Sequence, residues 1–231
     1  MNTIKLVVAK EIPSILFITA LICAFFFMMG NAIKKSDPYA KPKGLAFLGL
    51  WLVDVIDNYV LASMDEDSVE KMGPYIGSIA AYILLSNYAG LFGMNNPTGS
   101  WSVTLVLALI SWIMIERQNL ITNGIKGYIK QFFEPVFIFF LPNFIGKFSP
   151  LISMSFRLFG NILSGTIIMT IVYWGCMLAS NAILGLVGIS NVNFVGIAVA
   201  PILHCYFDIF SGFIQMFIFI TLTMCLIQKE K

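Results

Sequence analysis

The chain has 231 residues, of which 58% are hydrophobic and 11% are charged, and its mean hydropathy is +0.87. These values exclude an ordinary soluble domain and indicate a protein whose main solvent is lipid. The formal net charge is only +2, and the basic residues sit in short clusters, so nothing indicates nucleic-acid binding. We therefore expect an all-α integral membrane protein with a single membrane domain over residues 1–231.

Apolar runs of about 20 residues, the length that crosses a bilayer core, predict five membrane-spanning helices. Their expected ranges are 12–33, 74–93, 100–115, 142–178 and 194–228. The second and third are separated by the uncharged, turn-rich stretch MNNPTG, which predicts a hairpin. The last two are longer than a perpendicular span needs, so we expect both to be steeply tilted.

One further helix is predicted to lie along the membrane surface. Residues 44–63 are apolar except for Asp54, Asp57 and Asn58, which fall on one narrow helical face. This pattern is typical of an interfacial amphipathic helix. The segment MDEDSVEK that follows is expected to be a solvated acidic loop, and Glu116 and Glu134, at the ends of spans, are expected to be solvated too.

The distribution of Lys and Arg predicts the orientation, because these residues are retained on the cytoplasmic side. Basic clusters follow the first and third spans and end the chain, whereas the connections 94–99 and 175–193 carry no charge. We expect the N-terminus outside, despite Lys5 and Lys10, and the C-terminus in the cytoplasm. The uncharged external turns and the absence of a cleavable leader favour a bacterial plasma membrane.

Polar residues inside the apolar runs mark candidate functional positions. A central Arg or Asp costs about 2.5 to 3.5 kcal/mol on insertion scales, so it usually faces water, a partner or an ion path. Arg157, Asn161 and Ser164 share one face of the fourth span, and Thr166 faces the opposite side. The fifth span carries a polar stripe at spacings i, i+4, i+7 and i+11: His204, Asp208, Ser211 and Gln215.

The opposite directions of these two spans order the polar groups in depth. Arg157 and Gln215 fall near mid-membrane, and Thr166, His204 and Asp208 fall in the outer half. The proton-capable groups thus form a series that leads from outside toward a fixed cation. This arrangement is typical of a half-channel.

Other interpretations remain open at this point. Arg157 and Asp208 can form a structural salt bridge, His204 can be a satisfied interfacial residue, and Asn161 can join helices by hydrogen bonds. A small secondary transporter also places polar groups at mid-membrane, but it normally shows two similar halves, which are absent here. A structural scaffold does not explain Arg157, and no nucleophile, metal cluster or carboxylate pair indicates an enzyme, a cofactor or a metal site.

The segment PLISMSFRLFGNILSG, residues 150–165, resembles the arginine-bearing signature of subunit a of F-type ATP synthases. Two more segments resemble the same family: SNYAGLFGMNNPTGSWSVTLVLAL (86–109) is similar to its hairpin, and FDIFSGFIQMFIFITLTM (207–224) to its last helix. The resemblance covers nearly the whole chain from about Gly73 onward. It implies a stator subunit that offers two ion half-channels to a rotating ring of subunit c. Such a subunit is not catalytic by itself.

The partners that the resemblance implies are the c-ring, subunit b of the stator stalk, other ATP synthase subunits and membrane lipid. Arg157 matches the family's essential arginine, which attracts the ring carboxylate and blocks leakage between the half-channels. Asn161 and Gln215 match positions near that arginine, and Asn87 matches one that lines the outer path.

One departure from the family concerns the outer path. Asp208 falls where relatives commonly carry Glu or His and would relay the incoming proton, but Thr166 stands where many carry His or Glu. We hypothesise that His204, one helical turn before Asp208, supplies the missing titratable group. The sequence leaves the choice between proton and sodium open.

Overall fold

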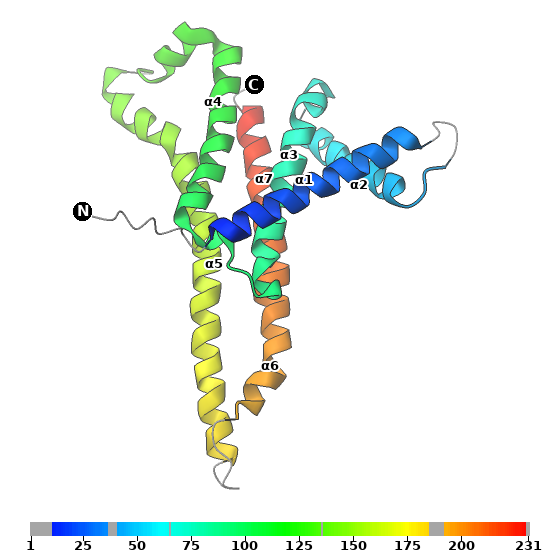
Figure 1. Cartoon of the computed structure of the whole chain (residues 1–231). Coiled ribbons are helices and arrows are strands. Elements are labelled where there is room, and N and C mark those ends of the chain that lie inside the picture. Colours follow the sequence, from blue (N-terminus) through cyan, green and yellow to red (C-terminus); the bar gives the residue numbers. More distant parts are fainter. Residues whose placement is uncertain (1–10, 37–40, 65, 135, 185–191, 230–231) are drawn as a thin grey trace, which may run out of the picture.

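The computed structural model describes residues 11–36, 41–64, 66–134, 136–184 and 192–229, and within these ranges it contains helices and no strand (Figure 1). The helices in chain order are α1 (Ile12–Lys35), α2 (Leu45–Leu61), α3 (Glu66–Tyr88), α4 (Trp101–Gln131), α5 (Phe140–Leu184), α6 (Phe194–His204) and α7 (Ser211–Lys229). The 3₁₀ turns η1 (Ala89–Phe92), η2 (Pro97–Gly99) and η3 (Phe137–Phe139) lie between them, and the π-helix η5 (Cys205–Phe210) joins α6 to α7. Lys5, Lys10 and part of the predicted external connection, 185–191, lie outside the described residues.

Five helical stretches are long and apolar enough to cross a membrane: Ile12–Lys35, Val69–Phe92, Trp101–Gln131, Phe137–Leu184 and Phe194–Lys229. This confirms the predicted fold class, an all-α integral membrane protein. The 45 residues of α5 make a helix about 67 Å long at 1.5 Å per residue, about twice the thickness of the hydrocarbon core. Because α1 crosses α5 and α7 at a steep angle (Figure 1), these helices cannot all stand upright in one bilayer.

Several helices extend beyond the apolar runs that predict them. α3 begins at Glu66, so the predicted acidic loop forms its first turns and Pro74 lies inside the helix. Acidic residues are favoured at this end because the helix dipole is positive there. α4 continues past the predicted end at 115 to Gln131, with non-helical backbone at Gly124, where φ is 65° and ψ is 171°. An apolar run shows where lipid contact ends, whereas a helix continues into water as long as its backbone remains hydrogen-bonded.

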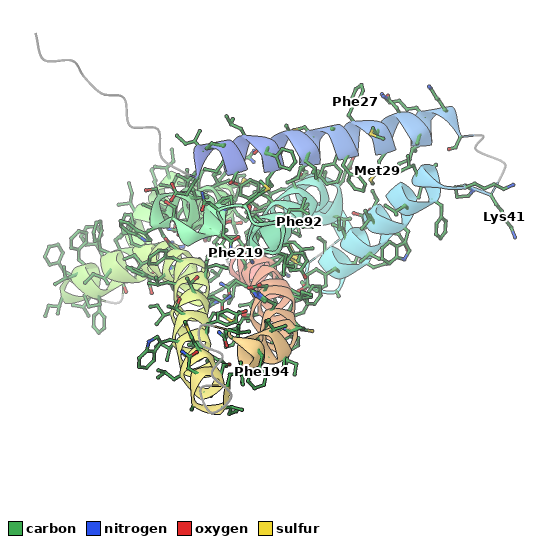
Figure 2. All side chains as sticks on the ribbon, turned by 60° about the horizontal axis from the view of Figure 1, so that its bottom comes forward. Phe27, Met29, Lys41, Phe92, Phe194 and Phe219 are labelled. Carbon is green, nitrogen blue, oxygen red and sulfur yellow. The ribbon has the colours of Figure 1, made fainter. Side chains whose placement is uncertain are left out.

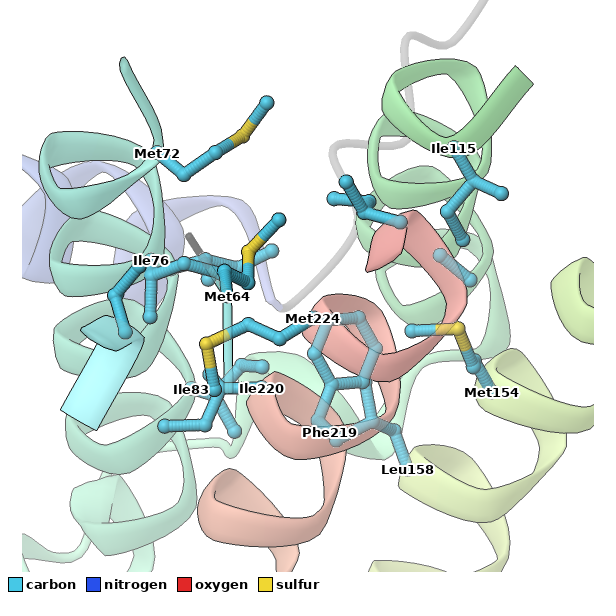
Figure 3. Close-up of a cluster of buried hydrophobic side chains, with 14 residues drawn as sticks. Met64, Met72, Ile76, Ile83, Ile115, Met154, Leu158, Phe219, Ile220 and Met224 are labelled. Carbon is cyan, nitrogen blue, oxygen red and sulfur yellow. The ribbon is translucent and has the colours of Figure 1, made fainter. Parts of the chain in front are cut away.

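α7 is the central helix of the fold. Figure 3 shows Phe219 and Met224 of α7 between side chains of α3 on one side and of α4 and α5 on the other, and their exposed fractions are 1% and 0%. Leu158 of α5 is also fully buried in this cluster. The approach of α3 to α7 is close at Gly212, where an added Cβ would lie 3.1 Å from the Asn87 Cβ and from the Tyr88 ring.

α1 and α2 lie on one side of the other helices and pack against each other. Met29 lies between the two helices, with 4% of its surface exposed, whereas Phe27 points away from them and is 71% exposed (Figure 2). The Tyr59 hydroxyl of α2 lies 2.5 Å from the Thr221 hydroxyl of α7. The predicted surface helix is therefore fixed to the central helix by a specific polar contact as well as by apolar packing.

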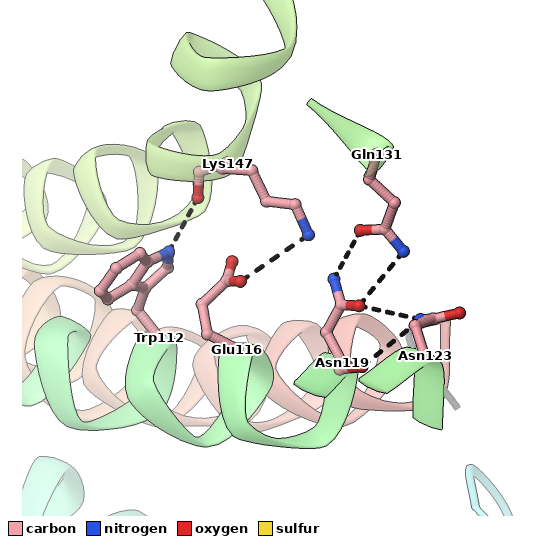
Figure 4. Close-up of polar contacts among 6 residues, drawn as sticks. All are labelled: Trp112, Glu116, Asn119, Asn123, Gln131 and Lys147. Atoms are coloured by element: carbon pink, nitrogen blue, oxygen red, sulfur yellow. Dashed lines mark hydrogen bonds and ion pairs between the residues drawn. The ribbon is translucent and has the colours of Figure 1, made fainter. Parts of the chain in front are cut away.

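A polar cluster joins the middle of α4 to the first turns of α5 and to the end of α4 itself (Figure 4). Glu116 is 9% exposed, and its carboxylate lies 3.7 Å from the Lys147 ammonium group. The Trp112 indole N–H donates to the Lys147 carbonyl at 2.8 Å, and Asn119 and Gln131 bond through their amides at 3.0 Å. The prediction that Glu116 is solvated is wrong, because the first turns of α5 cover it and bring a counter-charge. Glu134 remains exposed beside Lys130.

Replacing Gly212 with alanine should destabilise the protein, because the added methyl group meets Asn87 and Tyr88 at distances that force α3 and α7 apart. We expect a loss of about 1 to 3 kcal/mol, seen as a lower midpoint of thermal denaturation in detergent. Gly30→Ala is the matched control, since a Cβ at Gly30 meets nothing within 4 Å. Equal midpoints for the two variants would contradict the close approach of α3 and α7.

Candidate functional site

Arg157 lies at the edge of the exposed face of α5. Phe156 and Leu163, 55% and 45% exposed, belong to this face, and Leu158 on the other side is fully buried. Arg157 itself is half-buried. Among the residues that the structure describes, its guanidinium makes no hydrogen bond and no ion pair. No described residue therefore neutralises its charge.

Asp208 is paired with His204. The Asp208 Oδ2 atom lies 2.5 Å from the His204 Nδ1 atom, and the other ring nitrogen, Nε2, lies 2.9 Å from the Tyr173 hydroxyl of α5. The His204 and Asp208 side chains are 45% and 25% exposed, so both remain partly accessible. A salt bridge between Arg157 and Asp208, the structural alternative, is absent from the described contacts.

Tyr173 is the member of this group that sequence reasoning missed. Tyrosine is common where helices meet the membrane surface, so a tyrosine toward one end of a span carries little signal. Spacing offers the one useful signal, because Tyr173 follows Thr166 by seven residues and so lies on the same side of α5. The Thr166 hydroxyl donates to the Ile162 carbonyl of its own helix at 2.9 Å and does not reach α6.

α5 and α7 meet through a direct polar contact. The Ser211 hydroxyl donates to the Asn161 Oδ1 atom at 2.9 Å. Because these helices run in opposite directions (Figure 1), Arg157, four residues before Asn161, and Gln215, four residues after Ser211, come to the same level. Gln215 is 5% exposed, and its Nε2 atom is buried with no hydrogen-bond partner in the described structure.

The polar stripe is interrupted by the π-helix η5, which contains Asp208. The Tyr88 hydroxyl of α3 donates to the Ile209 carbonyl within η5 at 3.2 Å. Single π turns inside α-helices occur frequently at functional sites, and they change the direction of the side chains that follow. The predicted stripe assumed α-helical spacing from His204 to Gln215 and did not include this turn.

Asn87 of α3 is buried against η2 and α7, with 2% of its surface exposed. Its Nδ2 atom donates to the Gly212 carbonyl at 3.2 Å, and its Oδ1 atom accepts from the Thr98 hydroxyl at 2.8 Å. Asn87 thus contacts α7 one residue from Ser211 and, through Thr98, holds the hairpin turn against that helix. Thr98, fully buried, was not among the predicted residues.

The fold and the site together define a multi-pass membrane protein with ionisable groups gathered where α5 meets α6 and α7, as expected of a subunit that passes ions. The family model described as ATP synthase A chain matches residues 13–228. The chain belongs to this family, the subunit a family of ATP synthases. The match agrees with the resemblance at 150–165 and leaves no support for a small secondary transporter.

Individual relatives are also described as subunit a of an ATP synthase. The chain is 29% identical over 175 residues to "ATP synthase subunit a, sodium ion specific" of Propionigenium modestum, a match that covers 69% of this chain and only 54% of that protein. It is 29% identical over 230 residues to "ATP synthase subunit a" of Mycoplasma genitalium, covering 92% and 76%. The Helicobacter pylori strain P12 subunit is 32% identical over 183 residues, covering 75% and 80%. The predicted family is confirmed, and the chain is a non-catalytic component of an ATP synthase complex.

The contact between Asn161 and Ser211 can be tested by cross-linking. In a background without the chain's four cysteines, we expect Asn161→Cys and Ser211→Cys to be joined by a short thiol cross-linker in native membranes. Thr166→Cys with Ser211→Cys is the control pair and should remain unjoined, because Thr166 lies on another side of α5. Equal cross-linking of both pairs would show that α5 and α7 meet in a different register.

Proposed function

We propose that this chain passes ions to a rotating ring of subunit c through two half-channels that meet at Arg157. The observation that carries the proposal is the Arg157 guanidinium, which has no partner in the described part of the chain and lies beside the exposed face of α5. A charge held in a membrane needs a partner or water. A carboxylate on a ring subunit, at the same depth, meets this need.

Arginine suits this position because it cannot be deprotonated in a protein. Its fixed charge draws the ring carboxylate into its ionised form, so that the carboxylate releases its ion as it passes. The same charge repels cations that would otherwise move directly from one half-channel to the other. Asn161, near the level of Arg157, is half-buried and provides an amide group beside the surface that the ring carboxylate crosses, whereas Gln215, at the level of Arg157, is buried within the chain.

The outer half-channel is proposed to lie between α5 and α6, where Asp208 and His204 are paired. Both side chains are partly exposed, and their hydrogen bond joins two titratable groups on one helix. This pair takes the place of the two titratable groups that many relatives carry on facing helices. His204 thereby compensates for Thr166, whose hydroxyl is engaged within α5.

The exposed apolar face of α5 is the surface that we assign to the c-ring. Leu163 and Ile167, 45% and 49% exposed, extend this face from Phe156 toward the outer end of the helix. Subunit b of the stator stalk, other ATP synthase subunits and lipid cover the remaining surface. The chain has its N-terminus outside and its C-terminus in the cytoplasm of a bacterial cell, which puts the pair of Asp208 and His204 in the outer half of the plasma membrane.

The ion that we propose is the proton, because an imidazole that is bonded to a carboxylate can bind and release one. Sodium is the second candidate, since the Propionigenium modestum relative, 29% identical, is described as sodium ion specific. The two candidates differ in the gradient that drives the complex. In liposomes that hold the whole complex, a proton gradient should drive ATP synthesis without sodium. Synthesis that requires a sodium gradient would instead assign sodium.

Arg157→Gln should abolish ATP synthesis driven by an ion gradient in these liposomes, because the ring carboxylate loses the charge that ionises it. Asp208→Asn should lower the rate by roughly 100-fold, the usual effect of removing a proton-transferring group. Arg117→Gln is the matched control: Arg117, the chain's other arginine, is exposed near the middle of α4, and its variant should match the wild type. Normal coupled synthesis by an assembled Arg157→Gln complex would refute the half-channel proposal.

A further inference from the structure

Tyr173 of α5 contacts the pair of Asp208 and His204 in the proposed outer half-channel. We infer that Tyr173 is a positioning residue for ion translocation, whose hydroxyl holds the His204 ring in one orientation while that ring gains and loses a proton. The inference rests on the proposed function, since it assigns a role within the same outer half-channel. It concerns a residue outside the set that the sequence predicts.

The geometry gives His204 a hydrogen-bond partner at each nitrogen. The Tyr173 hydroxyl lies 2.9 Å from Nε2, and the Asp208 Oδ2 atom lies 2.5 Å from Nδ1. An ionised carboxylate can only accept hydrogen bonds, so the proton of a neutral His204 ring lies on Nδ1. The Nε2 atom is then the basic nitrogen, and the Tyr173 hydroxyl donates to it.

A hydroxyl suits this place because it both donates and accepts hydrogen bonds. When Nε2 binds one incoming proton, the ring becomes an imidazolium, and its new N–H donates to the Tyr173 oxygen. The Nδ1–H bond to Asp208 is unchanged. Loss of the same proton restores the first arrangement. Tyr173 therefore keeps its bond to His204 in both protonation states, and the ring need not rotate between them.

The hydroxyl is not needed to hold α5 and α6 together, because other contacts do this nearby. The Asn193 Nδ2 atom donates to the Tyr173 carbonyl at 3.3 Å, and the Val195 amide donates to the Ser180 hydroxyl at 3.1 Å. The Asn193 side chain also accepts from the Gly196 amide at 2.8 Å, which caps the start of α6. These bonds use backbone and side-chain groups that Tyr173→Phe leaves intact, so that variant removes the hydroxyl alone.

Thr166 cannot take this role. Its hydroxyl is bonded to the Ile162 carbonyl, and its side chain is too short to reach α6 from the same side of α5. Tyr173, two turns further along that side, has both the length and the hydroxyl. On α5, the Tyr173 hydroxyl is thus the group that contributes to the outer path. It binds no ion itself and acts through His204.

The test compares Tyr173→Phe with Tyr206→Phe. Tyr206 is 57% exposed on η5 and packs against Phe210, and no hydroxyl bond is found for it among the described residues, so its variant is a matched control. His204 is the chain's single histidine, so ¹⁵N spectra of the full chain, labelled at histidine and reconstituted in lipid bilayers, report this ring alone. Because Asp208 keeps the proton on Nδ1, we expect one tautomer in all three proteins. The Nε2 resonance should shift in Tyr173→Phe, which removes the hydrogen bond to that atom, and should keep its wild-type position in Tyr206→Phe.

The whole complex in liposomes gives the second readout. Tyr173→Phe should lower the rate of gradient-driven ATP synthesis by at least about tenfold, and Tyr206→Phe should leave it unchanged. An unchanged Nε2 resonance or an unchanged rate in Tyr173→Phe would overturn the inference. Either result would leave the proposed function standing if Arg157→Gln still abolishes synthesis, so the two failures are distinguishable.

Discussion

The packing of α7 between α3 and the pair α4 and α5 fixes every other part of the site. Phe219 and Met224 are buried on both sides of this helix, and Gly212 lets the backbone of α7 approach α3. Because α7 continues from α6 through η5, the same packing sets where Asp208 and His204 lie against α5. Ser211 and Asn161 then set the register between the two long helices, and Arg157 comes level with Gln215.

The polar groups around α5 and α7 include two kinds. Those of Asn87, Thr98, Asn161 and Ser211 are bonded to each other or to backbone, as expected where no water competes. The Arg157 guanidinium and the Gln215 Nε2 atom have no partner among the described residues. An unpaired polar atom in an apolar setting costs free energy. Of these two groups, only the half-buried Arg157 guanidinium lies beside an exposed face, and we propose that another subunit meets it there.

Much of this arrangement could be predicted from the sequence, because charge is rare in apolar runs. Arg157 and Asp208 stand out for that reason, and the spacing of His204 and Asp208 predicts their contact. Tyr173 could not be found in this way, since the role of its hydroxyl depends on which helix faces it. The π-helix η5 has no local signal, and the burial of Glu116 depends on the approach of Lys147 from another helix. Tertiary contacts decide each of these features, whereas composition decides the spans.

The open position of Arg157 also bears on how the complex is assembled. A copy of the chain that is inserted without its partners exposes a guanidinium to lipid, at a cost of about 2.5 to 3.5 kcal/mol on insertion scales. A partner that brings a carboxylate to the same depth removes this cost, so the charge to which we assign a role in transport also favours association. Unassembled copies are correspondingly less stable in the membrane, which gives cellular quality control a physical means to distinguish them from copies in a finished complex.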